Sequence, residues 1–597
     1  MTTETASRTA FFEAISAVAQ TQRAVDLRRA HAQSPSRAED LTFEADGLVA
    51  DLSRAWIDPS AVAHLCSAAR AAGIERARDA QLAGARVNTT EDRAALHSAL
   101  RWPAGTAGER WRAALAERAD AHGISTARSG NDQSLAEYHA EANRGRDAMC
   151  ALADTVRSGT MRGCTGQAFT DVINLGIGGS DLGPALLVDA LSGADGPRPR
   201  IHFVANVDPV ALDRALAACD PATTLVVVVS KSFSTLETMD NFRRASAWLR
   251  AGLAGAIDGD PVAHHAVAVS SATEKAIAAG IAPARIIGFG DWVGGRTSVW
   301  SPVGLAAAIG IGPAAFGDFL AGGHAMDRHF ATAPLERNLP VLLGILQRLY
   351  VNGFNLPSRA VVPYCEALRR LPDYLQQLEM ESNGKRVMVD GAELHDRQTS
   401  GIVLGGLGTN AQHAFFQMLH QGTAIVPCEF LLFARGVAGA DQDSDSQSDS
   451  HSQSRSRSHR LLVANAIAQA DSLAYGRTRQ ETAAALTASG HSPQDVERLT
   501  PHCTFPGNRP STLLIAERLT PFVLGQLLAL YEHRVAVEGA LLGINPFDQF
   551  GVELGKVQAR DVIAALEAPD GSPAQDAGPS AHLIRRLCQM ARGSEDR

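Results

Sequence analysis

The sequence has few cysteines and no long apolar run. Its eight cysteines form no CxxC pair and have no nearby histidine at ligand spacing, so neither a zinc site nor a disulfide framework is indicated. No window approaches the roughly 20 apolar residues of a membrane-spanning helix, and the amino terminus lacks the basic flank and apolar core of a signal peptide. These absences predict a soluble, cytoplasmic protein with free thiols, no metal and no membrane contact.

A net positive charge is also lacking. The 597 residues include 55 basic and 64 acidic side chains, for a formal net charge of -9. This balance argues against a general electrostatic attraction to nucleic acid or to an anionic membrane. The length predicts several domains with a large buried core. The expected partner is therefore a small molecule or another protein.

Lysine is the scarcest charged residue. Arginine is abundant, but the chain contains only four lysines, at Lys231, Lys275, Lys385 and Lys556. A chain that favours arginine keeps a lysine by chance, or where a compact ammonium does something that a planar guanidinium cannot. Each lysine is therefore a candidate functional residue.

The hydrophobic pattern changes along the chain. Apolar residues recur at helical spacing over 1–150, whereas from residue 171 short apolar runs such as TLVVVVS alternate with amphipathic segments. A second set of such runs follows a helical stretch at 301–350. This alternation predicts parallel sheets covered on both faces. We predict a helical segment at 1–150, α/β domains at 151–310 and 311–520, and a helical segment at 521–597.

Residues 436–459 interrupt the second α/β domain. The stretch GVAGADQDSDSQSDSHSQSRSRSH has almost no apolar side chain, so it cannot offset the entropy lost on ordering. Its acidic half roughly balances the Arg-Ser end, which argues against nucleic-acid binding. We interpret it as a disordered surface insertion.

Two predicted strands end in loops suited to an anion. Asn174–Pro184 (NLGIGGSDLGP) turns from a strand through glycines into a helix, which presents backbone N–H groups. Val229–Thr238 (VSKSFSTLET) places four hydroxyls around Lys231 after another strand, an arrangement that suits a phosphate monoester. It lacks the spacing of an ATP-binding loop. A tight turn and a Ser/Thr-rich helix cap are the respective alternatives without a ligand.

Four further stretches place a titratable residue beside glycines or small polar residues. They are Asp291–Trp300 (DWVGGRTSVW), Gln376–Lys385 (QQLEMESNGK), Gly408–Gln417 (GTNAQHAFFQ) and Gly543–Lys556 (GINPFDQFGVELGK). Singly, Arg296 could be a surface ion pair, Glu381 an exposed helix residue and His413 a core histidine.

In this order, the stretches resemble the glucose-6-phosphate isomerase (phosphoglucose isomerase) family. The resemblance starts at Asn88–Arg101 (NTTEDRAALHSALR) and continues to Lys556, and DWVGGR and FDQFGVELGK match its most diagnostic signatures. The sequence departs from the family pattern at Thr297, Leu236, Leu378 and the insertion. None of these positions is one that the family uses chemically.

The resemblance implies interconversion of glucose 6-phosphate and fructose 6-phosphate through a cis-enediol. Glu381 matches the family's base, Arg296 the cation that stabilises the intermediate, and His413 with Lys556 the ring-opening pair. The implied contacts to sugar or phosphate are Gly179, Ser180, Ser230, Lys231, Ser232, Thr235, Gln377 and Gln549. Lys385 is expected to support the Glu381 turn, and Lys275 is left as an ordinary helix residue. No cofactor or metal is implied.

The resemblance also implies two sugar-isomerase (SIS) type α/β/α sandwich domains with mainly parallel sheets and helical extensions at both ends. It further implies a homodimer in which His413 completes the partner's active site. Two other functions remain open. One is a different SIS-domain phosphosugar isomerase, such as an amino-sugar phosphate isomerase, for which a glutaminase or amine-handling segment is expected and not found. The other is a non-catalytic phosphosugar-binding regulator, which could lose Glu381, Arg296 or His413, all of which are present.

Overall fold

The computed structural model describes residues 3–22, 25–124, 133–193, 199–436, 450–568 and 580–595. The chain divides into two compact units, Met1–Pro546 and Phe547–Arg597. The predicted C-terminal segment 521–597 therefore crosses the border between the units. The other predicted domain boundaries stay predictions.

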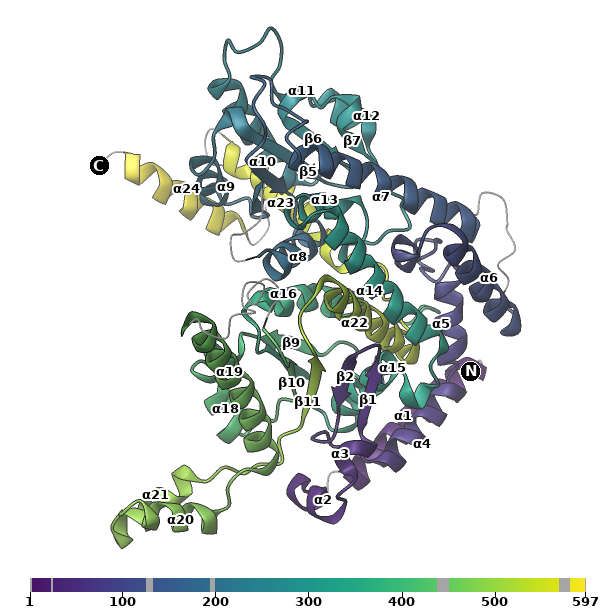
Figure 1. Ribbon diagram of the computed structural model, residues 1–597, viewed down its shortest axis with the longest axis vertical. Coiled ribbons are helices and arrows are strands. Elements are labelled where there is room, and N and C mark those ends of the chain that lie inside the picture. Colours follow the sequence, from purple (N-terminus) through teal and green to yellow (C-terminus); the bar gives the residue numbers. More distant parts are fainter. Residues whose placement is uncertain are drawn as a thin grey trace. The chain divides into compact units, whose positions relative to one another are not determined.

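The first unit begins with seven helices and one short hairpin (Figure 1). The helices are α1 (Thr3–Gln22), α2 (Leu27–Gln33), α3 (Arg37–Asp40), α4 (Pro59–Ala71), α5 (Ile74–Leu82), α6 (Gly105–Ala121) and α7 (Leu135–Arg157). The hairpin consists of β1 (Thr42–Ala45) and β2 (Leu48–Asp51). Its turn, Asp46-Gly47, has positive φ at both residues, as a two-residue hairpin turn of this kind requires. The wholly helical interpretation of residues 1–150 is therefore wrong at 42–51.

The first sheet contains five parallel strands in the order β4-β3-β5-β6-β7. They are β3 (Asp171–Leu175), β4 (Arg200–Val204), β5 (Thr224–Val229), β6 (Ala266–Val269) and β7 (Ile286–Ile287). Every residue of β3, β5 and β6 is buried, as their continuous apolar runs predict for strands covered on both faces. The helices of this region are α8 (Leu182–Leu191), α9 (Pro209–Ala217), α10 (Leu236–Gly252), α11 (Val262–His265) and α12 (Thr273–Ala278).

The second sheet has six strands in the order β1-β2-β11-β10-β8-β9. β8 (Ser358–Pro363), β9 (Ile402–Gly405), β10 (Cys428–Phe433) and β11 (Ser511–Ala516) are parallel, and the hairpin joins β11 antiparallel. Helices of this part are α16 (Leu371–Leu375), α17 (Gly408–Gln412), α18 (Phe416–Gln421), α19 (Ser450–Tyr475), α20 (Arg479–Ala488) and α21 (Pro493–Cys503). The prediction of two α/β layers with mainly parallel sheets is confirmed.

The interpretation of 436–459 as disordered fails over its second half. Residues 437–449 lie outside the described residues, but α19 already begins at Ser450. Further along this helix, Ala466, Ala470 and Leu473 are buried in the core of the second sheet. A helix anchored in this way extends into a polar stretch without a new nucleation step.

Four further helices belong to the first unit. They are α13 (Leu305–Ile311), α14 (Pro313–Thr332), α15 (Leu339–Arg348) and α22 (Pro521–Leu542), and α22 packs against α14 and α15. The second unit contains α23 (Glu553–Glu567) and α24 (Ala581–Glu595). None of the helices in the described ranges combines the length and apolar character needed to cross a membrane.

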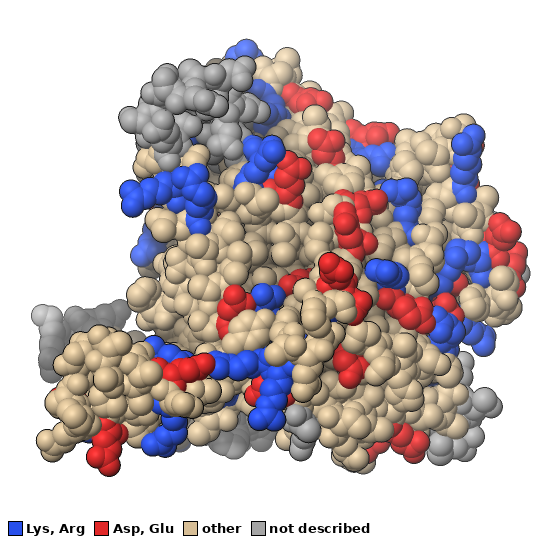
Figure 2. All heavy atoms as spheres, turned by 60° about the horizontal axis from the view of Figure 1, so that its bottom comes forward, with Lys and Arg blue, Asp and Glu red and all other residues tan. Residues whose placement is uncertain are grey.

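Acidic and basic side chains are interspersed on the face that Figure 2 shows. Many exposed arginines pair with a carboxylate, as Arg243 does with Asp240 and Arg250 with Asp260. Such exposed pairs contribute little to stability.

Candidate active site

The two anion loops meet at one edge of the first sheet. β3 and β5 are neighbours, and β4 lies on the other side of β3, so the strand order reverses between the carboxyl ends of β3 and β5. Ligands of open parallel sheets bind at such a switch point. The loop after β3 (residues 176–181, the glycine turn) and the loop after β5 (residues 230–235, the hydroxyl loop) both begin there.

The glycine turn is in close contact with the segment that carries Arg296. A Cβ at Gly179 would lie 1.7 Å from the carbonyl oxygen of Gly295, so no other residue fits without a shift of the backbone. Gly178 has φ of +62°, and a Cβ there would lie 2.9 Å from Nε2 of Gln377. The glycines therefore let the turn approach both Arg296 and Gln377.

The hydroxyl loop is held in a defined conformation. Ser230 is buried and its Oγ lies 3.1 Å from Oγ1 of Thr235, while Ser234 donates to Oγ of Ser232. Phe233 has a positive φ of 46°, and its buried ring packs against Phe242. A left-handed non-glycine residue is uncommon and is held by its surroundings. Alternation of right- and left-handed residues turns successive N–H groups toward an anion.

Two of the four lysines hold this loop in place. Lys231 donates from Nζ to the carbonyl oxygens of Asp291 at 2.8 Å and Val293 at 3.4 Å, which links the loop to the segment before Arg296. Burial and the charge of Arg93 lower the pKa of Lys231. Lys275 donates to the carbonyl oxygen of Ser232 at 3.2 Å. Lys275 lies on α12, as expected of a helix residue, and its contact with Ser232 also connects that helix to the hydroxyl loop.

Arg296 and Glu381 lie together although 85 positions separate them in the sequence. Nη1 of Arg296 lies 3.3 Å from Oε1 of Glu381. The guanidinium also donates from Nε to Ser382 Oγ at 2.7 Å and from Nη2 to the carbonyl oxygen of Pro546 at 3.3 Å. The Arg296 side chain is only 4% exposed and that of Glu381 is 21% exposed. The result is a fixed, shielded cation beside a carboxylate that solvent can still reach.

Glu381 ends a short π-helix, η10 (Gln376–Glu381). Such π-helical turns are rare in proteins overall, and those that occur are frequently found at functional sites. Lys385 donates from Nζ to the carbonyl oxygens of Glu381 and Ser382, each at 2.8 Å. A cation at the carboxyl end of a helix satisfies its last carbonyl groups, so Lys385 supports the Glu381 turn as expected.

His413 is not joined to this pair by the contacts of the described residues. His413 follows α17 and is exposed, and in the described ranges no hydrogen bond or ion pair joins it to Arg296 or Glu381. Gln549 and Lys556 belong to the second unit. There Lys556 forms an exposed ion pair of 2.8 Å with Glu553.

Asp181 is a titratable residue of the glycine turn that sequence reasoning missed. It is buried, and burial raises the pKa of its carboxyl to about 6. The signal available in the sequence was its position directly after Ser180, in a predicted binding loop. Carboxyl groups with shifted pKa values are common at functional sites.

In the described residues, one mixed cluster has metal-ligating side chains, at Asp171, His202 and Cys219. Arg200 already forms an ion pair with Asp171 at 2.8 Å, and Nε2 of His202 lies 2.8 Å from the same carboxylate. Burial raises the pKa of Cys219 to about 11, whereas a metal needs the thiolate. The cluster therefore fits an ion pair better than a metal site.

Comparison with known proteins gives a consistent assignment. A family model described as phosphoglucose isomerase matches residues 51–582. The chain is 42% identical over 584 residues to the glucose-6-phosphate isomerase of Rhizobium meliloti, covering 98% of this chain and 100% of the relative. It is 46% identical to that of Jannaschia sp., covering 91% and 92%. The crystal structure of a glucose-6-phosphate isomerase from Chlamydia trachomatis superposes with a TM-score of 0.76 at 30% identity, over 97% of this chain and 99% of that one. The chain therefore belongs to the phosphoglucose isomerase family.

Proposed function

We propose that this protein interconverts glucose 6-phosphate and fructose 6-phosphate. The observation that carries the proposal is the Arg296–Glu381 pair, 3.3 Å apart and in contact, through Gly179, with an anion-binding edge of the first sheet. The reaction needs a base and a fixed cation at the reacting carbons and a phosphate site some distance away. The family assignment supports the same activity.

The phosphate binds at the hydroxyl loop in this proposal. Ser230, Ser232 and Thr235 supply hydroxyl donors, and Lys231 supplies positive charge from the same loop. The phosphate is remote from C1 and C2, so these contacts hold the sugar in position for reaction. Gly179, Ser180, Gln377 and Gln549 are the proposed further contacts to sugar or phosphate.

Glu381 is the proposed general base. It takes the proton from C2 of the open aldose; the electron pair of that C–H bond forms the C1=C2 double bond of the enediol, and the π pair of the C1=O bond moves onto O1. A proton then moves from the O2 side to the O1 side, and Glu381 returns its proton to C1, which gives the ketose. One carboxylate can serve both carbons because the proton leaves and returns on the same face.

Arg296 stabilises the negative charge that develops on the enediol oxygens. A buried cation that is already fixed in place stabilises this charge more in the transition state than in the ground state. A guanidinium suits the role because it stays protonated at any working pH. Its three hydrogen-bonded nitrogens support the proposal, since they fix its orientation.

Ring opening precedes isomerisation and needs proton transfer between the ring oxygen and the anomeric hydroxyl. His413 and Lys556 are the proposed pair for this step. The family resemblance places the histidine in the partner's active site, so we propose a homodimer. The exposure of His413 in a single chain is consistent with that role.

The reaction has no net redox change and is proposed to need no cofactor and no metal, because Arg296 already stabilises the negative charge of the enediol. We propose the cytoplasm as its location and phosphosugars as its partners, with no nucleic acid and no membrane among them.

A coupled assay of the purified protein with fructose 6-phosphate tests the proposal, with Glu381→Gln as the control. We expect turnover by the wild type that the control lacks. Binding of fructose 6-phosphate without turnover would indicate a non-catalytic regulator instead. Turnover of a different sugar phosphate alone would indicate another SIS-domain isomerase.

A further inference from the structure

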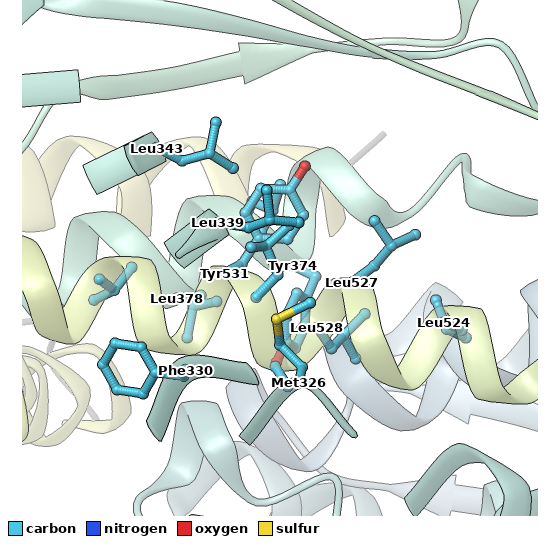
Figure 3. Close-up of a cluster of buried hydrophobic side chains, with 14 of the residues drawn as sticks. Met326, Phe330, Leu339, Leu343, Tyr374, Leu378, Leu524, Leu527, Leu528 and Tyr531 are labelled. Carbon is cyan, nitrogen blue, oxygen red and sulfur yellow. The ribbon is translucent and has the colours of Figure 1, made fainter. Parts of the chain in front are cut away.

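Helix α22 runs through the core of the first unit and is buried over most of its length. Seventeen of its 22 residues are buried. Figure 3 shows its apolar side chains among residues of α14, α16 and η10, including Met326, Phe330, Tyr374 and Leu378. The helix nevertheless carries four buried acidic or basic residues, Glu532, His533, Arg534 and Glu538. Because buried charges require partners, the contacts of these four residues show what α22 holds in place.

Glu532 holds the segment of Arg296 through an indole. Trp300, four residues after Arg296, donates from Nε1 to Glu532 Oε1 at 2.7 Å. The other carboxylate oxygen of Glu532 accepts from Arg101 at 2.6 Å, and Arg101 also pairs with Asp327 at 2.6 Å. The Arg101 guanidinium lies 4.4 Å above the Trp300 ring. All three charged side chains are fully buried, so Trp300 is fixed on two sides.

Arg534 reaches the helix of Glu381 through a second cluster, in which its contact with Glu379 is an ion pair of 3.8 Å. The cluster comprises three arginines and three glutamates, Arg348, Arg359, Arg534, Glu379, Glu429 and Glu538. Glu379 accepts from Arg359 and lies 3.8 Å from Nη2 of Arg534. It stands on η10 two positions before Glu381, so the two side chains leave the helix in roughly opposite directions. The charges of this buried cluster balance, with Glu379 as its connection to the site.

Two further contacts join α22 to the same pair. Asn383, which lies two residues after Glu381, donates from Nδ2 to the carbonyl oxygen of Val535 at 3.3 Å. At the end of α22, a Cβ on Gly539 would lie 2.9 Å from Cγ of Pro546, and the carbonyl oxygen of Pro546 accepts from Arg296. The base and the cation are therefore each tied to one helix by separate contacts.

We propose that Glu532 and Arg534 are positioning residues, which set the distance between Arg296 and Glu381 through Trp300 and Glu379. This inference rests on the proposed function. Arg296 acts on charge that exists only during the reaction, so a small displacement of its segment weakens the transition state more than the bound substrate. Loss of a positioning contact lowers kcat and leaves KM nearly unchanged.

Trp300→Phe tests the proposal because it removes one N–H and keeps an aromatic ring to stack on Phe319, whose ring centroid lies 4.2 Å away. We expect a kcat about 10-fold lower with KM within about 2-fold of wild type. The matched control is Trp56→Phe, which removes an indole N–H bonded to Asn508 at 3.2 Å, in a part of the chain outside the proposed site. It should leave both constants unchanged.

A double-mutant cycle with Arg296→Lys shows whether Trp300 acts through Arg296. Contacts that act through one residue are not additive, so Trp300→Phe should lower kcat by less than about 2-fold in the Arg296→Lys background. An equal loss in both backgrounds, or a wild-type kcat for Trp300→Phe, would overturn the proposal.

If Trp300→Phe does not fold, Glu379→Gln provides the second test from the other cluster. It should lower kcat and leave the inhibition constant of inorganic phosphate unchanged, because the hydroxyl loop is not touched. A wild-type kcat, or a parallel loss of phosphate binding, would contradict the positioning role. A wild type inactive on fructose 6-phosphate would instead refute the proposed function, and the inference with it.

Discussion

Gly179→Ala perturbs the closest contact in the candidate site. The added Cβ would lie 1.7 Å from the carbonyl oxygen of Gly295 and 3.0 Å from the backbone nitrogen of Arg296, whereas ordinary contact begins at 3.4 Å. The oxygen is half of the required distance away and belongs to backbone, so it cannot rotate aside. The glycine turn and the Arg296 segment would have to separate by about 1.7 Å at this point, because packed interiors leave no room to absorb the methyl group.

The separation has different effects on stability and on catalysis. Overpacking of one methyl group typically costs about 1 to 3 kcal/mol, which a protein of this size with an extensive core tolerates. A misplacement of about 1 Å of a reacting group can lower the rate about 100-fold. We therefore expect a folded protein with kcat about 100-fold lower and a smaller change in KM.

Steady-state kinetics and thermal unfolding of Gly179→Ala measure both effects. Gly317→Ala on α14 is the matched control, because a Cβ there meets nothing within 4 Å. It should keep wild-type kinetics and raise stability by about 0.5 to 1 kcal/mol, as alanine does in place of a helical glycine. A kcat within threefold of wild type for Gly179→Ala would refute the reasoning.

Four further outcomes are expected. Glu381→Gln should bind fructose 6-phosphate and lose about 100-fold or more in kcat; more than a tenth of wild-type turnover would remove Glu381 from the role of base. Lys231→Arg should raise KM more than it lowers kcat, since a bulkier cation displaces the hydroxyl loop, and kinetics identical to wild type would contradict this. Lys275→Ala should raise KM about threefold through loss of one exposed hydrogen bond to Ser232, whereas a fall in kcat alone would contradict a role at the loop. Burial raises the pKa of Asp181 to about 6, so the ionised carboxylate destabilises the folded state above that pH. Asp181→Asn should therefore raise the melting temperature at pH 8 and leave it unchanged near pH 3.5. An equal rise at both pH values would show that charge is not the cause.

Local sequence pattern predicts the strands of the first sheet well. The continuous apolar runs of β3, β5 and β6 indicate strands buried on both faces, and this holds because strand period and burial are local properties. The hairpin at 42–51 shows the limit of the helical interpretation. Asp46-Gly47 between alternating apolar residues is a strong hairpin signal, but it is short and lies within a long region of helical period.

The residues of the candidate site could be found from the sequence, but their association could not. Each motif marks a strand end or helix end where backbone can approach a ligand. Nothing local places Arg296 beside Glu381 or Gly179 against Gly295, because these contacts depend on how separate elements pack. The family resemblance supplied the roles, and the geometry then brought Arg296, Glu381 and Gln377 to the glycine turn.

The ionic residues of α22 show most clearly what local pattern cannot reveal. Charged residues such as Glu532, Arg534 and Glu538 normally mark the solvated face of a helix, yet all three are buried. Stability alone does not explain their presence, since well-packed hydrophobic residues in place of a buried ion pair are often neutral or stabilising. Ionic hydrogen bonds add direction, because a guanidinium and a carboxylate meet in few orientations. In this protein a directional hydrogen bond from Trp300 reaches Glu532 on α22, whereas Glu379 accepts its hydrogen bond from Arg359 and forms a longer ion pair of 3.8 Å with Arg534. Trp300 and Glu379 each lie within four residues of a group proposed to act on the substrate.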